Sequence, residues 1–270
     1  MGYILFRYRY ILIMRKILRN LWLTSLGCFR KPNPGIHILN AHYMNPTSDP
    51  DNGEQLKRQI KQILKYAELI RIEKAVELIN NKIKVDIPLV AFTFDDGFLD
   101  CYTVIAPILE SFGTNAAFFI NPNLVECSDS YYEEFSKRAT INNKKIMNWE
   151  QIKELYNRGH IIGSHTMDHL NLGDETLSEA ILFEQIANSK RVIETKVGNN
   201  CNMFAFPYGT FSHLSEKALD IALKNYEYIF SGTDYKNYFS FDNKVINRRH
   251  LEPFWSIPHL KYFLSVNKKY

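Results

Sequence analysis

The stretch Pro88-Leu-Val-Ala-Phe-Thr-Phe-Asp-Asp-Gly97 decides which fold class this sequence predicts. Residues 89–92 form a continuous apolar run, which is typical of a parallel strand covered on both faces. Two adjacent carboxylates, Asp95 and Asp96, follow this run, and Gly97 allows the chain to turn. Because ligands bind at the carboxyl ends of strands in α/β folds, the stretch predicts a functional site where the strand ends.

Two carboxylates in one pocket repel each other, and a bound cation relieves that repulsion. One aspartate then becomes a ligand, while the other stays free to act as a base. The alternative is an ordinary surface turn, because Asp-Gly is a common turn dipeptide. The buried strand that precedes the pair favours the functional interpretation.

The sequence around this stretch alternates strands with helices. We expect strands at 36–43, 88–94, 115–120, 160–164, 202–206 and 226–231. We expect helices at 52–66, 72–81, 100–112, 149–157, 175–197 and 212–225, with Asn148 as an N-cap. The alternation predicts a parallel α/β arrangement, and 270 residues are enough for a single barrel domain.

Residues 121–145 interrupt this alternation as a polar insertion. Two tyrosines in it, Tyr131 and Tyr132, are either surface-loop side chains, which we favour, or residues that stack on a sugar. Outside the insertion, polar residues follow the predicted strands one after another: His42, Asp95, Asp96, His165, Pro207 and Tyr208. In a barrel these strand ends meet at one mouth, so we expect the side chains to converge there.

The histidines His165 and His169 are four residues apart. In an extended strand they would be about 13 Å apart, whereas metal–nitrogen bonds are only about 2 Å long. One ion can therefore bind both only if the chain coils after His165, as residues i and i+4 do on a helical turn. Two histidines and one aspartate leave an open position, which is typical of a catalytic zinc site. The alternative is that these are two ordinary histidines that bind no metal ion.

Two segments resemble the first two motifs of the polysaccharide deacetylase family (carbohydrate esterase family four): Thr93-Phe-Asp-Asp-Gly97 and Ser164-His-Thr-Met-Asp-His169. The flanking segments 147–155, 159–163 and 204–209 agree as well, and the similarity covers about residues 36–250. The resemblance implies a distorted (β/α) barrel of about seven parallel strands with its active site at the C-terminal strand ends. It also implies metal-dependent removal of acetyl groups from an N-acetylated sugar.

The resemblance assigns roles to individual residues. It implies that Asp95 is the general base and that a divalent metal, zinc or alternatively cobalt or nickel, is held by Asp96, His165 and His169. The backbone N–H of Tyr208, which follows Pro207, would donate to the oxyanion. An acid must also protonate the leaving amine.

The sequence departs from the commonest pattern of the family at two points. The arginine usual in the third motif is missing, because Phe204-Ala205 stands there, and the late Leu-x-His motif that supplies the acid is not recognisable. Leu39-Asn-Ala-His42 instead resembles the Asn-Tyr-His of the poly-N-acetylglucosamine deacetylase subgroup. We therefore expect His42 to be the acid. The weaker rivals, which follow no clear strand, are His250 and His259.

The missing arginine has two replacement candidates, Arg248 and Arg249, although we expect both to be surface charges. The basic residues are unevenly placed: residues 1–48 contain seven of them and no acidic residue. The rest of the chain is weakly acidic, so we expect no nucleic-acid binding. We expect residues 1–35 to form a basic extension with few core contacts and 36–270 to form the catalytic domain.

The basic extension could touch an anionic membrane surface. No run reaches the roughly 18 apolar residues of a membrane span, and no clear signal peptide is present, so we expect a cytoplasmic or membrane-peripheral location. Met14 offers an alternative start to Met1.

The leading functional hypothesis is a deacetylase acting on a carbohydrate. The alternatives are an amidohydrolase for a small non-sugar amide and a catalytically weakened carbohydrate-binding protein.

Overall fold

The structure of the chain is a computed structural model that describes residues 14, 18–45, 53–139, 141 and 144–270. The described residues form a single ten-stranded sheet. Its strands are β1 (Gly35–Ala41), β2 (Glu68–Leu69), β3 (Pro88–Phe94), β4 (Ala116–Ile120), β5 (Ile161–Ser164), β6 (Met203–Ala205), β7 (Tyr228–Ser231), β8 (Phe239–Ser240), β9 (Val245–Asn247) and β10 (Arg249–His250). The strand order is β10-β1-β3-β4-β5-β6-β7-β9-β8, with β2 paired to β3.

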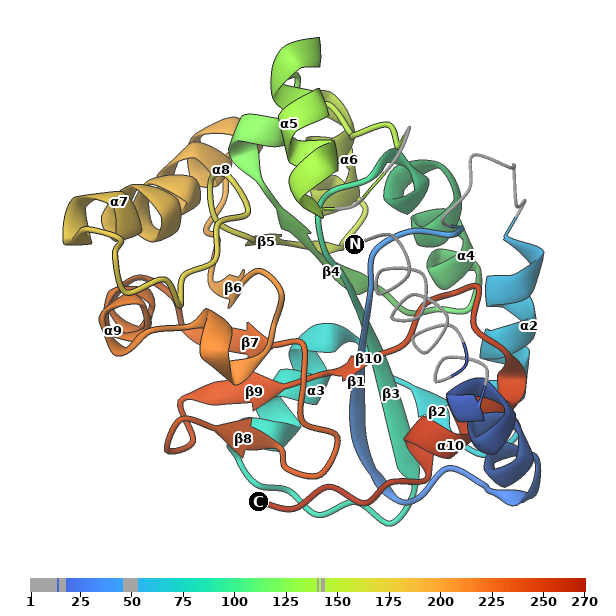
Figure 1. Cartoon of the computed structure of the whole chain (residues 1–270). Helices are drawn as coiled ribbons and strands as arrows, with labels where there is room; N and C mark the ends of the chain where they lie inside the picture. The colour runs from blue at the N-terminus through green and yellow to red at the C-terminus, as the bar shows by residue number, and fades with distance from the viewer. Residues whose placement is uncertain (1–13, 15–17, 46–52, 140, 142–143) are drawn as a thin grey trace, which may run out of the picture.

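All neighbouring strands of this sheet run parallel except β8 and β9. β9 pairs with β7, whereas β10 pairs with β1 at the opposite edge, and only Arg248 separates the two strands in the sequence. Residues 245–250 therefore join the two edges of the curled sheet, as Figure 1 shows. The expected distorted (β/α) barrel is confirmed.

The helices surround this sheet (Figure 1). They are α2 (Glu54–Ile63), α3 (Ile72–Asn80), α4 (Ala106–Ser111), α5 (Asp129–Ala139), α6 (Trp149–Asn157), α7 (Glu179–Phe183), α8 (Ser189–Val197), α9 (Glu216–Asn225) and α10 (Ile257–Leu264). Wider π-helical turns, Cys101–Ile105 and Glu184–Asn188, lead into α4 and join α7 to α8. Asn148 caps α6 as expected, and its side chain accepts from the backbone of Gln151.

The central strands are buried on both faces. In β3, Leu89 and Ala91 belong to one apolar cluster with residues of α3, while Val90, Phe92 and Phe94 belong to another. Successive side chains of a strand point to opposite faces. A continuous apolar run such as 89–92 is therefore what this position requires, and the strand expected at 88–94 has those bounds in the structure.

Two expectations for secondary structure were wrong. Residues 121–145 contain the helix α5 rather than only a polar loop, and Phe135 of this helix is buried. The second error lies after residue 231, where no regular structure was expected but β8, β9, β10 and α10 follow. Four of the six residues of 245–250, Val-Ile-Asn-Arg-Arg-His, are polar, so the segment does not show the apolar pattern of a buried strand.

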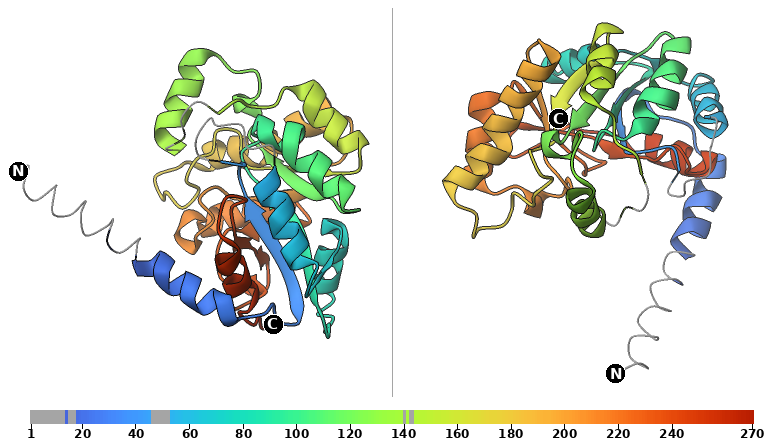
Figure 2. Two further views of the ribbon diagram at one scale, coloured as in Figure 1. Left: turned by 90° about the vertical axis from the view of Figure 1, so that its right-hand side faces the viewer. Right: turned by 90° about the horizontal axis from the view of Figure 1, so that it is seen from above.

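Residues 18–29 are helical and pack against α10, and Figure 2 shows the two helices in contact. Leu23 is buried in the main core, the rings of Trp22 and Tyr262 are 5.5 Å apart, and Lys261 donates to the carbonyl of Cys28. The expectation of few core contacts was therefore wrong for this segment. Arg7, Arg9, Arg15 and Lys16 lie outside the described residues. Among the described helices, none has the length and apolar character that crossing a bilayer requires.

Candidate active site

Hydrogen bonds between neighbouring strands bring the predicted strand-end residues together. Ala41 pairs with Phe94, and the backbone N–H of Asp95 donates to the carbonyl of Ala41 at 2.9 Å. The backbone N–H of His165 likewise donates to the carbonyl of Ile120, at 2.9 Å. The expected convergence is thus present: a cavity of about 240 Å³ is lined by His42, Asp96, His169, Tyr208, His250 and Glu252, among others.

Three ligand-type atoms face one another at this cavity, which two of the three residues, Asp96 and His169, line directly. The carboxylate oxygen Oδ1 of Asp96 lies 3.6 Å from Nε2 of His165 and 3.5 Å from Nε2 of His169. All three side chains are buried. The chain coils between the histidines as expected, but through left-handed residues at Thr166 (φ 67°) and His169 (φ 54°) rather than a helical turn. Such strained backbone at non-glycine residues is concentrated at functional sites.

This set of atoms fits a metal ion. Ligands held tetrahedrally at metal bonds of about 2.0–2.2 Å are about 3.3–3.6 Å apart, which matches both separations. Oδ1 of Asp96 is buried and has no hydrogen-bond partner among the described residues, which is costly for a carboxylate without a cation. Nδ1 of His165 lies 2.6 Å from the carbonyl of Ala205, and this contact leaves Nε2 free to bind an ion.

A residue that sequence reasoning missed, Asp168, ties this ligand set to the insertion. Its carboxylate accepts hydrogen bonds from Tyr131 at 2.5 Å, from Asn123 at 2.7 Å and from Gln185 at 2.6 Å. The segment His165-Thr-Met-Asp-His169 contains the signal that could have identified Asp168, because this aspartate stands between the two histidines. The insertion therefore fixes the turn that carries His169.

The two tyrosines of the insertion have partners within the protein. The hydroxyl of Tyr131 donates to Asp168, and that of Tyr132 donates to the carbonyl of Lys144. Neither of these described side chains lines the cavity at the ligand set. Phe135, from the same helix, packs edge-on against His169 with ring centroids 5.8 Å apart, so α5 supports the site through its apolar face.

The second aspartate of the pair, Asp95, forms a bidentate ion pair with Arg248. The guanidinium donates to both carboxylate oxygens, at 2.7 and 2.8 Å, and to the hydroxyl of Thr93 at 3.1 Å. Burial alone would raise the pKa of the Asp95 carboxyl, but Arg248 holds it far below its usual range. Asp95 is therefore ionised and oriented without being part of the ligand set.

The expectation that Arg248 and Arg249 are surface charges was wrong, because both are buried. Arg248 reaches Asp95 from the segment that joins the sheet edges, so it is the one of the two that can replace the missing third-motif arginine. Arg249 instead donates to the carbonyls of Phe263 and Val266, at 2.7 and 2.5 Å, at the end of α10. Only the first of the two therefore belongs to the site.

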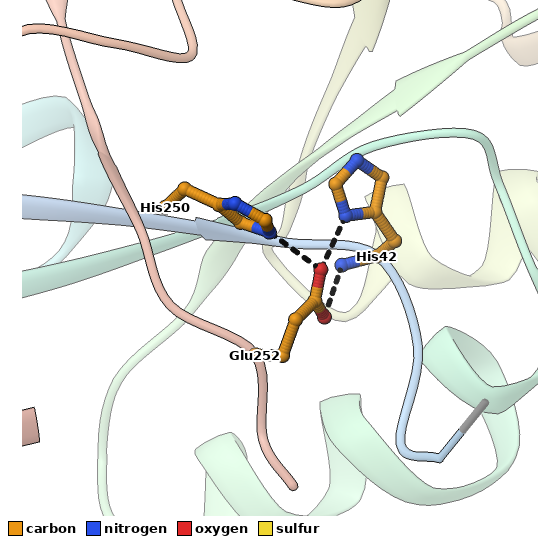
Figure 3. A group of neighbouring side chains, drawn as sticks. All are labelled: His42, His250 and Glu252. Atoms are coloured by element: carbon orange, nitrogen blue, oxygen red, sulfur yellow. Dashed lines mark hydrogen bonds and ion pairs between the residues drawn. The ribbon is translucent and has the colours of Figure 1, made fainter. Parts of the chain in front are cut away.

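Elsewhere in the lining of this cavity, Glu252 joins two histidines (Figure 3). Its Oε1 lies 2.5 Å from Nδ1 of His42 and 2.8 Å from Nε2 of His250, and its Oε2 accepts from the backbone N–H of His42 at 3.1 Å. Burial would lower the pKa of His42, but the Glu252 carboxylate raises it well above the ordinary value. Sequence reasoning did not identify Glu252 as part of the site.

The rival histidines are placed differently by the structure. His250 ends β10, contrary to our expectation that it follows no clear strand, and its neighbour across the strand pair is Asn40. It therefore lies beside His42 in the cavity wall. His259 instead lies 3.3 Å from the carbonyl of Asn20, next to the N-terminal helix, and does not line the cavity.

The remaining predicted residues, Pro207 and Tyr208, follow β6. Pro207 is buried, whereas Tyr208 is exposed and its ring lies 4.8 Å from that of His169. Tyr208 has a left-handed backbone (φ 62°), a conformation that is uncommon for a large side chain. The turn thus presents its backbone and ring to the ligand set.

A second cavity, of about 590 Å³, adjoins the first beside the N-terminal helix, and we call it the outer cavity. The two share Tyr43, His250 and Glu252 in their walls. The outer cavity adds Phe254 and Trp255, together with Arg19 from the N-terminal helix. The rings of Tyr43 and Phe254 are stacked with centroids 6.0 Å apart, so the combined groove has an aromatic side.

A barrel mouth of this kind, with a ligand set on one side of a cavity and proton-carrying groups on the other, is typical of hydrolases that use a divalent ion. The family model that matches the chain defines a more specific class of protein than this site geometry does. It is described as polysaccharide deacetylase and matches residues 82–226, more than half of the chain, and the chain belongs to this family.

Relatives and solved structures agree with this assignment. YxkH of Bacillus subtilis is 28% identical over 131 residues, which cover 48% of this chain and 40% of YxkH. A chitin deacetylase of Arthroderma benhamiae is 30% identical over 153 residues, which cover 55% of this chain and 35% of that protein. The match thus spans less than half of either relative. IcaB from Ammonifex degensii shares the fold, with a TM-score of 0.64, 20% identity and coverage of 87% of this chain and 99% of IcaB.

Proposed function

We propose that this protein is a metal-dependent hydrolase that removes N-acetyl groups from an N-acetylglucosamine-type surface polysaccharide or oligosaccharide. The observation that carries the proposal is that one cavity is lined both by residues of a metal-type ligand set and by His42, with the ionised Asp95 next to that set. The metal would be zinc, with cobalt or nickel as alternatives, held by Asp96, His165 and His169.

A divalent ion at this set would polarise the acetyl carbonyl and acidify a water molecule. Asp95 is free of the ligand set, and we assign it as the base that takes the proton of the attacking water. Arg248 keeps this carboxylate ionised and fixes the direction of its oxygens. The backbone N–H of Tyr208 is assigned as the donor to the oxyanion that forms at the carbonyl oxygen.

The leaving group of an acetamide is an amine, which departs readily only when it is protonated. We assign the donor as His42, whose side chain is 28% exposed and lines the same cavity as Asp96. Its Nδ1 faces Glu252, so the other ring nitrogen, Nε2, lies on the side of the ring away from the glutamate (Figure 3). A histidine paired with a carboxylate stays protonated and is thus ready to donate.

The outer cavity favours a sugar chain over a small non-sugar amide. Aromatic rings at Tyr43, Phe254 and Trp255 give flat apolar surfaces of the kind on which sugar rings stack. A small amide would have no use for a groove of this length. A relative named chitin deacetylase supports the same choice, because chitin is a polymer of N-acetylglucosamine.

Acetate release tests this proposal. Purified protein should release acetate from chitooligosaccharides or poly-N-acetylglucosamine faster than from small amides, chelation should abolish the release, and added zinc, cobalt or nickel should restore it. Equal activity on small amides would favour the amidohydrolase. Sugar binding without any acetate release would favour the carbohydrate-binding alternative, and full activity in metal-stripped protein would exclude the metal-dependent reaction.

We also propose a peripheral contact between the N-terminal segment and an anionic membrane. Supporting it, the helical residues 18–29 expose Leu18, Leu21, Trp22 and Phe29 on the same segment as Arg19. Apolar side chains next to basic ones are typical of helices that lie on a membrane surface. Co-sedimentation with vesicles containing phosphatidylserine should occur, and it should weaken in Trp22→Ser; unchanged sedimentation would count against this contact.

A further inference from the structure

The cavity contains a second group of three metal-type ligand atoms. His42, His250 and Glu252 each offer one ligand atom, and these atoms all lie within 4.8 Å of one another. Oε1 of Glu252 contacts Nδ1 of His42 and Nε2 of His250. In Figure 3 the two imidazole rings point toward Oε1 of Glu252 from different strand ends, β1 and β10. This group lines the same cavity as Asp96 and His169, which belong to the first ligand set.

We propose that His42, His250 and Glu252 bind a second transition-metal ion when zinc or a similar ion exceeds the amount that fills the first set, and that this ion inhibits the enzyme. The binding part stands on the geometry alone. The inhibition part rests on the proposed function, because it follows from the role of His42 as proton donor: an ion coordinated by Nδ1 displaces the proton there, and the metal-bound ring that remains is a far weaker acid at Nε2 than the imidazolium.

The ligand types of the second group suit zinc, nickel or cobalt. Two imidazole nitrogens and one carboxylate oxygen form a set that such ions accept, whereas calcium and magnesium prefer oxygen ligands. The side chains of His42 and His250 are 28% and 37% exposed, so an ion can reach them from the cavity. Glu252 is buried and held from behind by the backbone N–H of His42, which orients its carboxylate.

The spacing of the second group explains why it should fill only at excess metal. Its nitrogen–oxygen separations, 2.5 and 2.8 Å, are hydrogen bonds, shorter than the about 3.3–3.6 Å of ligands around a tetrahedral ion. An ion must displace the bridging protons and move the side chains apart by less than about 1 Å. The first set already has the wider spacing. Binding to the second group should therefore be weaker and should weaken further as the pH falls, because protons compete with the ion.

Calorimetric titration of the full-length protein with zinc chloride tests the binding. The wild type should bind one tight equivalent and a second, weaker one. His250→Gln, which keeps a hydrogen-bonding side chain beside Glu252, should keep the first equivalent and weaken the second on the order of 100-fold or more. Glu252→Gln should behave in the same way, Asp96→Asn should lose the tight equivalent, and the matched control His259→Ala should keep both. A single equivalent in the wild type, or a second equivalent unchanged in His250→Gln, overturns the site.

Inhibition is measured separately, as the activity at excess zinc divided by the activity of the same variant at one equivalent. This ratio should be well below one in the wild type and in His259→Ala, and close to one in His250→Gln. Binding of the second ion without any fall in the wild-type ratio overturns the inhibition and with it the donor role of His42. If the protein releases no acetate from any substrate, the proposed function fails, while the calorimetry still decides whether the second site exists.

Discussion

Two groups of side chains at the candidate active site both combine a carboxylate with two imidazoles but carry different chemistry. We name them the motif wall (Asp96, His165 and His169) and the closure wall (His42, Arg248, His250 and Glu252). In the motif wall, a carboxylate oxygen without a hydrogen-bond partner among the described residues stands 3.5–3.6 Å from two imidazole nitrogens. In the closure wall, a carboxylate oxygen stands 2.5–2.8 Å from two imidazole nitrogens.

A difference of less than about 1 Å between these spacings decides whether a proton or a metal ion fits between the side chains. A hydrogen bond joins atoms less than about 3.2 Å apart, whereas a metal ion separates its ligands by more than that. The motif wall is thus arranged for a cation and the closure wall for a proton. Within one cavity, this division would supply both partners that the proposed amide hydrolysis needs, an electrophilic ion and an acid.

The sharpest test of this comparison substitutes the two neighbouring aspartates one at a time. Asp95→Asn should keep the metal but lose turnover by about 10²–10⁴-fold, because it removes the base and leaves the ligand set intact. Asp96→Asn should lose both. Metal content after dialysis and kcat for acetate release measure the two properties. If Asp95→Asn loses the metal and Asp96→Asn keeps it, the roles must be exchanged.

The motif wall could be predicted from the sequence because its signals are local. Asp95 and Asp96 follow an apolar strand, and the spacing of His165 and His169 is visible within five residues. The parallel pairing of the strands then brings these segments together without any further information. The same reasoning correctly placed His42, since it follows β1 directly.

The closure wall could not be predicted in the same way. Arg248 is buried only because the chain passes from the β7 edge of the sheet to the β1 edge at that residue. This crossing depends on the curvature of the whole barrel, and an Asn-Arg-Arg-His segment gives no local sign of burial. Glu252 could not be predicted for a similar reason, because its two histidine partners come from opposite ends of the chain.

A second prediction concerns the buried ion pair of the closure wall. Arg248→Met should lower the free energy of unfolding by about 3–5 kcal/mol at neutral pH, because Asp95 then stays buried without its partner. Arg158→Met is the control: Arg158 pairs with Glu110 at 2.8 Å, but at the surface, and its loss should cost at most about 1 kcal/mol. Urea denaturation of the full-length variants measures both. Equal losses would show that Arg248 contributes no more than a surface charge.

The smallest expected effect tests what the Glu252 carboxylate does for His42. In the wild type the carboxylate raises the pKa of His42, so the imidazole stays protonated and the basic limb of the pH–rate profile lies at alkaline pH. Glu252→Gln removes the charge but keeps the shape, and burial then lowers that pKa. The basic limb should therefore move to lower pH by about one unit or more, with turnover on the acid side of the limb changed less than about tenfold.

The reference for this measurement is His42→Ala, which should lose the basic limb and most of kcat while it binds metal normally. Substrates with more acidic leaving groups need less protonation, so they should partly rescue His42→Ala and hardly distinguish Glu252→Gln from the wild type. An unmoved basic limb in Glu252→Gln would mean that another group donates the proton. The candidate would then be His250, which shares the same carboxylate oxygen and lines the same cavity.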